Sequence, residues 1–530
     1  MTRQSSQSLA CPLQRARALY ADSAAVIDGE RVLTYRDLAD EVASLGASLG
    51  DLLGISPGAR VGVLAANGTM HLECLMAIPA FGRTIVSLNS RLAVEELVML
   101  AEDADLSALF CDDRNLEAAI EIGRRCTGVR LIHEGSAPLP GGAVPFFELT
   151  TGNASLDDAP VLEADSLASI SYTGGTTGKS KGVMLTHANL LANAYHNLIA
   201  TGHRHEDRWL HACPMFHVAG TANVLAATWV GATQVVLPQF DAPAVCRTIE
   251  ERRITHTLLV PTMIGMLLDE DQANPADLSS LQHLQYAASP ISPTLQRRLL
   301  TRLECDVAQF YGMTEAAPTV TQCTPEDHRR GIRGEEPFAR RLSSIGTPVV
   351  GVQVRICDPD SGEPVEPGTV GELRVRGPNV MPGYWRRPEV SAEVLVDGWY
   401  RTGDAGYADS DGYIFVVDRL KDMIITGGEN VYSAEVEAVI LEHPGVLEVA
   451  VVGVPDAHWG ESVHAIARLS EGVSVDVDEL VAHCRPRIAG FKVPRAFTLT
   501  AEPLPRTASG KVLKAQLREQ FWTGTARAVN

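Results

Sequence analysis

The sequence YTGGTTGKSKG, residues 172–182, decides the fold of this chain. It directly follows ASIS, residues 168–171, a short run with the composition of a buried strand. The glycines let backbone N–H groups turn toward one point without a Cβ in the way, and the threonines and lysines add hydroxyl groups and positive charge. We therefore expect a loop at the end of a strand that binds a polyphosphate.

The last part of this loop, Gly178-Lys179-Ser180, resembles the end of a Walker A motif. That motif needs glycine five positions before Gly178, where Thr173 stands, so a P-loop kinase or ATPase is disfavoured. A flexible linker is the simpler alternative. The strand immediately before the loop favours phosphate binding over a linker.

The chain on either side alternates strand-like apolar runs with amphipathic helical stretches, which is the pattern of parallel α/β sheets. After about residue 345, short strands broken by Gly, Pro and Asp indicate antiparallel hairpins. We predict the α/β class with α+β parts. A large N-terminal body of parallel βα sheets covers 1–418 and includes a β-rich subdomain at about 345–418, and a small mobile α+β domain covers 419–530.

The chain has 530 residues, of which 45 are basic and 65 acidic, and its net charge of −20 repels polyanions. We therefore expect no nucleic-acid partner. The ten cysteines form no CxxC pair and the N-terminus lacks the apolar core of a secretory signal, so we expect reduced thiols in a cytoplasmic protein. Residues 210–239 carry no charge and are long enough to span a bilayer, but glycines and prolines interrupt them. We expect a buried helix and strand there, and no membrane span.

Extended to residue 187, the sequence YTGGTTGKSKGVMLTH resembles the phosphate loop of the adenylate-forming (ANL) superfamily, which includes the acyl- and aryl-CoA synthetases. The family usually has proline where Ser180 stands, a departure outside the glycine and threonine core. The resemblance implies that the loop binds the phosphates of ATP through Thr173, Gly174, Gly175, Thr176, Thr177, Gly178 and Lys181.

Four more segments are similar to the family's motifs and occur in the family's order: QFYGMTE (309–315), YRTGD (400–404), DRLKD (418–422) and PRTASGK (505–511). In the first, the resemblance implies that Tyr311 stacks on adenine beside Gly312, that Thr314 contacts the α-phosphate and that Glu315 holds Mg²⁺. For the later segments, the resemblance implies that Asp404 binds the ribose hydroxyls, that Arg419 lies near the ribose, that Lys421 is the hinge between the domains and that Lys511 is the catalytic lysine.

Activation of a carboxylate by ATP brings two anions together, so positive charge is needed where the transition state is most negative. The resemblance implies that Lys511 bridges the carboxylate and the phosphate. It also implies that a rotation about Lys421 then admits the CoA thiol, whose pantetheine arm would pass the backbone of Gly427 and Gly428. Without the family context, these glycines are only a turn before a helix with Ser433 as its expected N-cap.

MFHVAG (215–220) resembles the segment beside the acyl carboxylate, where His217 would pack against the substrate. Amino-acid-activating relatives have aspartate at this position, which disfavours an α-amino acid. The implied pocket residues are Val218, Ala219, Ala287, Ala288 and Ser289. Neither segment offers Arg or Lys for a second carboxylate, so we expect a medium-chain or branched fatty acid or an aryl acid, and leave both open.

We predict an ATP-dependent acid:CoA ligase that uses Mg²⁺, with ATP, CoA and a small carboxylic acid as its partners and a homodimer left open. One alternative is an acyl-AMP ligase that loads a carrier protein in trans. A luciferase-like oxygenase would share these motifs. A non-catalytic nucleotide-binding module would be expected to have lost Glu315 or Lys511, and both are present.

Three nearby histidines, His203, His205 and His211, suggest a metal site. They lie beside Arg204 and Glu206 in a charged segment. We expect surface histidines there, and no metal.

Overall fold

The computed structural model describes residues 7–138, 141–173, 180–470, 472–506 and 512–522. Its internal contacts divide these residues into two compact units. Unit 1 takes the described residues of 1–175, 180–353 and 375–400, and unit 2 takes those of 354–374 and 401–530. The predicted division at residue 418 stays a prediction.

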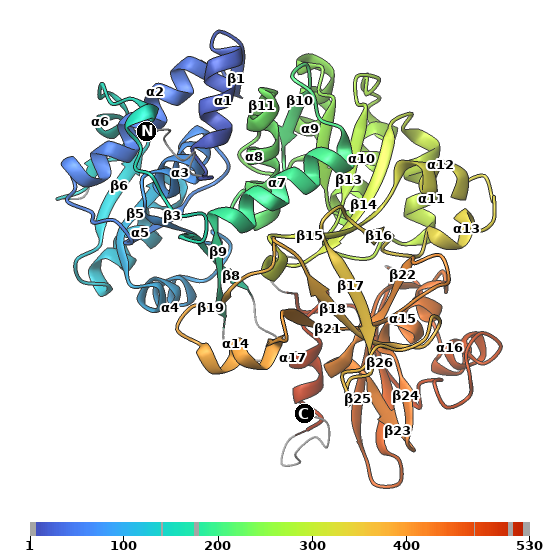
Figure 1. Cartoon of the computed structure of the whole chain (residues 1–530). Helices are drawn as coiled ribbons and strands as arrows, with labels where there is room; N and C mark the ends of the chain where they lie inside the picture. The colour runs from blue at the N-terminus through green and yellow to red at the C-terminus, as the bar shows by residue number, and fades with distance from the viewer. Residues whose placement is uncertain (1–6, 139–140, 174–179, 471, 507–511, 523–530) are drawn as a thin grey trace. The chain divides into compact units, whose positions relative to one another are not determined.

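Among the described residues, unit 1 contains a nine-stranded and an eight-stranded sheet (Figure 1). The order in the nine-stranded sheet is β16 (Thr347–Pro348), β15 (Thr319–Cys323), β14 (Asp306–Gly312), β13 (His283–Tyr286), β12 (His256–Leu259), β10 (Arg208–His211), β11 (Thr233–Val236), β1 (Ala24–Asp28) and β2 (Arg31–Thr34). The strands from β14 to β1 run parallel. This agrees with the predicted α/β pattern, because neighbouring parallel strands must be joined by a crossover connection, which is usually a helix.

The order in the eight-stranded sheet is β19 (Gly383–Tyr384), β9 (Lys181–Thr186), β8 (Leu167–Thr173), β4 (Thr84–Ser87), β3 (Arg60–Leu64), β5 (Leu106–Asp112), β6 (Arg130–Glu134) and β7 (Val144–Pro145). From β8 to β7 the strands are parallel, whereas β9 is antiparallel to both of its neighbours. The predicted phosphate loop therefore joins two antiparallel strands.

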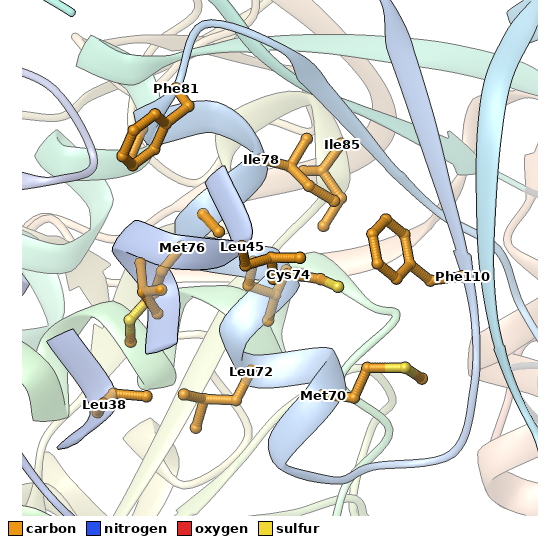
Figure 2. Close-up of a cluster of buried hydrophobic side chains, with 14 of the residues drawn as sticks. Leu38, Leu45, Met70, Leu72, Cys74, Met76, Ile78, Phe81, Ile85 and Phe110 are labelled. Carbon is orange, nitrogen blue, oxygen red and sulfur yellow. The ribbon is translucent and has the colours of Figure 1, made fainter. Parts of the chain in front are cut away.

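Helices α2 (Tyr35–Asp51) and α3 (Thr69–Ala80) share one buried cluster with strands of both sheets, so they lie between the sheets. Figure 2 shows Leu38 and Leu45 of α2 meeting the side chains of α3, among them Leu72. The outer faces are covered by α4 (Val94–Ala104) and α5 (Leu116–Arg125) on one sheet, and by α9 (Ala242–Arg252), α10 (Pro261–Ala273) and α11 (Pro293–Arg302) on the other.

The remaining helices of unit 1 are α1 (Cys11–Tyr20), α6 (Phe147–Thr150), α7 (His187–Thr201), α8 (Val218–Val230), α12 (Pro325–Gly331), α13 (Phe338–Arg341) and α14 (Pro388–Val394). The uncharged stretch 210–239 folds as predicted, into the largely buried α8 and the strand β11. Within the described ranges, no helix combines the length and the apolar composition that crossing a membrane requires. All ten cysteines are free thiols.

The predicted β-rich subdomain contains a sheet in the order β17 (Gln353–Cys357), β18 (Gly371–Arg376), β21 (Trp399–Ala408) and β20 (Leu395–Val396), with β22 (Ile414–Arg419) antiparallel to β21. The C-terminal sheet has the order β24 (Glu429–Val431), β23 (Ile424–Thr426), β26 (Gly460–Leu469) and β25 (Val446–Asp456), with β27 (Ala496–Thr500) beside β26. Helices α15 (Ser433–Leu441) and α16 (Val477–Cys484) pack on this sheet, and α17 (Lys514–Glu519) follows.

Substitution of Leu72 by alanine tests the core between the two sheets. Leu72 is fully buried, and a large-to-small change in a packed core costs about 2–5 kcal/mol because a cavity remains. We expect Leu72→Ala to lower the free energy of unfolding of unit 1 by this amount, which is measured as a lower urea midpoint. The control is Leu19→Ala on α1, where the leucine is 57% exposed and the midpoint should barely move. Equal effects of the two changes would contradict this packing.

Candidate functional site

The hairpin of β8 and β9 holds together the two ends of the predicted phosphate loop. Thr173 is the last residue of β8, Lys181 is the first of β9, and the two pair across the ladder. Oγ1 of Thr173 also donates a hydrogen bond to the backbone oxygen of Lys181 over 3.4 Å. The predicted residues between them, Gly174, Gly175, Thr176, Thr177 and Gly178, lie outside the described residues.

Lys181 and Glu315 meet at the side chain of Tyr384. The Lys181 ammonium lies 5.2 Å from the centroid of the Tyr384 ring, within the range of cation–π attraction. The Tyr384 hydroxyl donates to Oε1 of Glu315 over 2.8 Å. Since Tyr384 pairs with Val183 of β9, the ring is fixed next to the base of the loop. A cation and a carboxylate are thus brought to one aromatic side chain.

The segment that carries Thr314 and Glu315 is a tight turn between β14 and β15. A Cβ at Gly312 would lie 1.8 Å from the backbone oxygen of Pro318, so only glycine fits there. Asn379, which is fully buried, donates from Nδ2 to the backbone oxygens of Ala316 and Thr319, over 2.6 and 2.8 Å. These contacts fix the short 3₁₀ turn Thr314–Ala316, and Tyr311 lies directly before it on β14.

Tyr384 and Asn379 were not among the residues predicted for the site. They lie in an irregular segment around the two-residue strand β19, outside every recognised motif. Neither a period nor a spacing in the sequence marks them. Only the pairing of β19 with β9 reveals their position.

His217 stands at the start of α8, with its ring 4.6 Å from that of Phe216. The turn before it is tight, because a Cβ at Gly220 would lie 2.7 Å from the Cα of Met215. Asn67 secures this turn: its Oδ1 accepts from the backbone N–H of Met215 over 2.7 Å. The predicted site residue His217 is therefore half-buried at the end of a rigid loop.

The residues predicted for the acyl pocket are only partly brought together. Ala219 and Ala287 both pack against the buried cluster of Trp209 and Leu258. Val218 packs elsewhere, against leucines of β9 and α7. Ala288 and Ser289 follow β13 and are exposed, and Ala288 has a left-handed backbone with φ +77°.

A buried polar network fixes Tyr286, which directly precedes the predicted pocket residue Ala287. Its hydroxyl donates to Oε1 of Gln309 over 3.2 Å and accepts from Nε2 of Gln296 over 3.0 Å. Nε2 of His328 lies 3.0 Å from the same hydroxyl. Burial raises the pKa of Tyr286 and lowers that of His328, so both groups stay neutral near pH 7.

In unit 2, Asp404 and Arg419 form an ion pair on the neighbouring strands β21 and β22. The two residues are paired in the ladder, and Nε of Arg419 lies 2.6 Å from Oδ1 of Asp404. Oγ1 of Thr402 accepts from the backbone N–H of Asp404 over 3.0 Å. Two residues that the resemblance assigns to one ribose are therefore in direct contact.

The prediction that Ser433 caps α15 was wrong. Ser433 is the first residue of the helix, and the side chain of Tyr432, at the cap position, makes no capping bond. The carboxylate of Asp418 takes that role: its Oδ2 accepts from the backbone N–H groups of Ser433 and Ala434 and from the Ser433 hydroxyl. The Asp418 carboxylate, which β22 carries, thus lies at the positive end of the dipole of α15.

Lys514, at the start of α17, completes this buried charge network. Its Nζ donates to Oγ of Ser433 over 2.6 Å and lies 2.7 Å from Oε1 of Glu437. Burial lowers the pKa of Lys514, but the carboxylates of Glu437 and Asp418 outweigh this and raise it overall. The segment that follows the predicted catalytic Lys511 is therefore anchored to the start of α15.

Lys511 itself lies outside the described residues, as do the other residues of 507–511. Both flanks of this loop are held, since Arg506 and Val512 form a β-bridge and the backbone N–H of Leu513 donates to the Pro505 oxygen over 2.8 Å. The base of the loop is thus a closed hairpin.

The predicted hinge residue Lys421 lies in a 3₁₀ turn, Leu420–Asp422, directly after β22. Burial, and then the charges of Arg419 and Arg518, lower its pKa to about 8, against the opposing effect of Asp422. Gly427 and Gly428 form the two-residue turn between β23 and β24, with φ of +60° and +84°. A turn with two positive φ angles favours glycine at both positions.

Substitution of Asp418 by asparagine tests the charge network. An amide at position 418 carries no charge to accept from the first N–H groups of α15, and a hydrogen bond to a charged group contributes about 1.5–3 kcal/mol. We expect amide hydrogens of α15 to exchange about 10- to 100-fold faster in Asp418→Asn. The control is Glu442→Gln at the other end of α15, whose exposed ion pair with Arg487 contributes little. Unchanged exchange in Asp418→Asn would contradict the assigned role.

Comparison with known proteins agrees with this arrangement. The family model of the AMP-binding enzymes matches residues 13–385, and that of the AMP-binding enzyme C-terminal domain matches residues 435–511. The chain is 41% identical over 513 residues to a feruloyl-CoA synthase of Amycolatopsis sp, covering 96% of this chain and 98% of that protein. It is 34% identical over 521 residues to the fatty acid–[acyl-carrier-protein] ligase ScoC of Streptomyces coeruleorubidus, covering 96% and 95%.

Among solved structures, the chain resembles the o-succinylbenzoate coenzyme A synthetase MenE of Bacillus subtilis in complex with ATP and magnesium ion. The TM-score is 0.82 at 30% identity, over 96% of this chain and 98% of that one. The predicted fold class and the predicted resemblance to the adenylate-forming superfamily are confirmed. This chain belongs to the family of AMP-binding enzymes.

Proposed function

We propose that this protein is an ATP-dependent acid:CoA ligase. A carboxylate oxygen of the acid attacks the α-phosphorus of ATP, the bond to the bridging oxygen of the β-phosphate breaks, and acyl-AMP and pyrophosphate form. The CoA thiol then loses its proton and attacks the acyl carbon, and AMP leaves. Support comes from the two family models and from the feruloyl-CoA synthase that shares 41% of its sequence with nearly the whole chain.

The meeting of Lys181 and Glu315 at Tyr384 is the observation that carries this proposal. Lys181 supplies positive charge at the base of the loop, where the phosphates of ATP would bind beside Thr173. Glu315 fits a magnesium ligand, because Mg²⁺ prefers carboxylate oxygens and the Tyr384 hydroxyl orients this one. Bound there, Mg²⁺ would neutralise phosphate charge, and the MenE relative was solved with both ATP and magnesium.

The other nucleotide contacts are proposed from the family motifs. Tyr311 and Gly312 would hold the adenine, and Thr314 would contact the α-phosphate. The Asp404 carboxylate can accept hydrogen bonds from both ribose hydroxyls, and its ion pair with Arg419 holds it in place.

Transfer to CoA is proposed to use Gly427 and Gly428 of unit 2. Gly428 leaves open space where a Cβ would stand, so a pantetheine arm can pass close to the backbone. The hinge at Lys421, the cytoplasmic location and a homodimer stay predictions.

We propose an aryl acid of the cinnamate type as the acyl substrate. The feruloyl-CoA synthase relative supports this choice over a fatty acid. Ala219 and Ala287 present methyl groups beside Trp209, which suits an apolar ring. The half-buried His217 would pack against the carboxyl end of the acid.

A carrier protein is the second candidate acceptor. It is favoured by the similarity to ScoC, whose name gives an acyl carrier protein as its acceptor. Purified protein incubated with a carboxylic acid, ATP, Mg²⁺ and CoA would decide between the two.

The function is tested by a screen of aryl and aliphatic acids in which AMP and acyl-CoA are both measured by mass spectrometry. We expect equal amounts of the two products, with cinnamate-type acids fastest. AMP formation without any thioester would contradict CoA as the acceptor. No AMP with any acid would contradict the proposed function.

Lys511→Ala and Gly428→Trp should separate the two half-reactions. Without the Lys511 ammonium we expect pyrophosphate release to fall about 100- to 1,000-fold, as for other transition-state donors, while supplied acyl-AMP is still converted to thioester. Gly428→Trp should do the reverse, because an indole would block the thiol's path. Pyrophosphate release and thioester formation are measured separately for each variant.

Two matched variants control these effects. Lys492→Ala removes a C-terminal lysine whose Nζ is paired with Glu435, and should leave both half-reactions unchanged. Gly428→Ala carries the same backbone strain as the tryptophan variant without its bulk. Equal loss of both half-reactions in Lys511→Ala, or equal effects of alanine and tryptophan at position 428, would refute these roles.

A further inference from the structure

A buried cluster of imidazole and carboxylate groups lies at the amino ends of the parallel strands of the nine-stranded sheet. His203 follows α7, Asp207 directly precedes β10, and His256 is the first residue of β12. Their exposed fractions are 8%, 6% and 5%. The expectation of surface histidines was therefore wrong for His203, and also for His211, which is buried and bonded to Gln234.

The three side chains point their donor atoms at one another. Nδ1 of His203 and Nε2 of His256 each lie 3.7 Å from Oδ2 of Asp207, and all three atoms lie within 4.8 Å of one another. A separation of 3.7 Å is too long for a hydrogen bond. A tetrahedral zinc ion with bonds of about 2.0–2.1 Å holds its ligand atoms about 3.4 Å apart. The two nitrogen–oxygen separations would need to shorten by a few tenths of an ångström, and the nitrogen–nitrogen separation by at most about 1.4 Å, to reach that geometry.

The surrounding contacts orient these groups for a cation. Oγ1 of Thr255 lies 2.8 Å from Nδ1 of His256, a contact that leaves Nε2 facing Asp207. The backbone N–H of Arg204 donates to Oδ2 of Asp207 over 2.7 Å and fixes the carboxylate.

Two imidazole nitrogens near the cluster are buried and lack a hydrogen-bond partner among the described residues. Among the described residues, Nε2 of His203 is buried without a hydrogen-bond partner. His283 lies beside His256 through the register of β12 and β13, with the two rings 5.6 Å apart, and its Nε2 is likewise buried and unpaired. Unpaired buried polar groups are costly. Neither of these two nitrogens belongs to the set of atoms that faces Asp207, so they show that the region is polar and are not themselves proposed ligands.

We propose that His203, Asp207 and His256 form a zinc site, with a water molecule as the fourth ligand. Two imidazoles and one carboxylate are a common ligand set for Zn²⁺. The ion would tie the segment after α7 to β12, through residues that are 49 or more positions apart in sequence.

The site is separate from the ligase chemistry. His203, Asp207 and His256 lie at or before the amino ends of β10 and β12, whereas the His217 segment and Ala287 follow the carboxyl ends of β10 and β13. In parallel α/β sheets, substrates bind at the carboxyl ends. The proposed zinc is therefore a structural ion that takes no part in catalysis.

The test uses the full-length protein, stripped with EDTA and titrated with Co²⁺ in the absence of nucleotide. Tetrahedral Co²⁺ has strong visible absorption bands, and Zn²⁺ affinity follows from competition. We expect about one Co²⁺ per chain with such bands, displacement of Co²⁺ by Zn²⁺, and a rise in the thermal midpoint on zinc addition. His256→Gln and Asp207→Asn should weaken binding about tenfold or more.

His205→Gln is the matched control. His205 lies in the same segment but stacks on Tyr20, with its Nδ1 2.6 Å from the Gly231 oxygen, so its loss should leave metal affinity unchanged. Wild-type protein that develops no tetrahedral cobalt spectrum would overturn the proposal, and this measurement needs no variant to fold. Equal affinity in wild type and His256→Gln would overturn it too. Neither readout involves ATP, acid or CoA, so the ligase function is tested separately.

Discussion

The side chain of Tyr384 joins the two charged groups on which the candidate site of unit 1 depends. Its ring lies beside the Lys181 ammonium, and its hydroxyl donates to the Glu315 carboxylate. The contact requires close backbone packing on both sides. A Cβ at Gly182 would lie 2.8 Å from Cγ2 of Ile170, and one at Gly312 would meet the Pro318 oxygen. Glycine is therefore needed at these positions for space rather than for an unusual φ angle.

Local charge pairs offset the acidic character of the whole chain. With a net charge of −20, the protein repels an anion such as ATP at long range, so the cations that bind it must act at short distance. In unit 2, Arg419 pairs with the buried Asp404, and the largely buried Lys514 pairs with Glu437. Ion pairs of this kind fix geometry more than they add stability.

The sequence was sufficient to predict the parallel sheets, because apolar runs such as RVGVL (60–64) and HTLL (256–259) have the period and composition of buried strands. Thr173, Lys181 and Glu315 could also be named as candidate site residues from the sequence, because their spacing follows the family's motifs. The contacts that irregular segments make could not be predicted in this way. Tyr384 has no periodic neighbours, and the pairing of β19 with β9 crosses about 200 residues.

Two errors show why polar residues are harder to place. Ser433 has the side chain of an N-cap, but the Asp418 carboxylate from β22 displaces it from that role. His203 is followed by the charged residue Arg204, which is indeed exposed, yet the backbone turns the imidazole of His203 inward toward Asp207 and Trp209. Charge in the sequence indicates an exposed segment, not the direction of each side chain within it.

Isotope exchange between labelled pyrophosphate and ATP tests most directly whether the protein forms an acyl-adenylate. If it does, label enters ATP only when a carboxylic acid and Mg²⁺ are present, and CoA is not needed. Exchange that is absent with every acid, together with cleavage of ATP to ADP, would contradict adenylate formation at the site around Lys181, Tyr384 and Glu315.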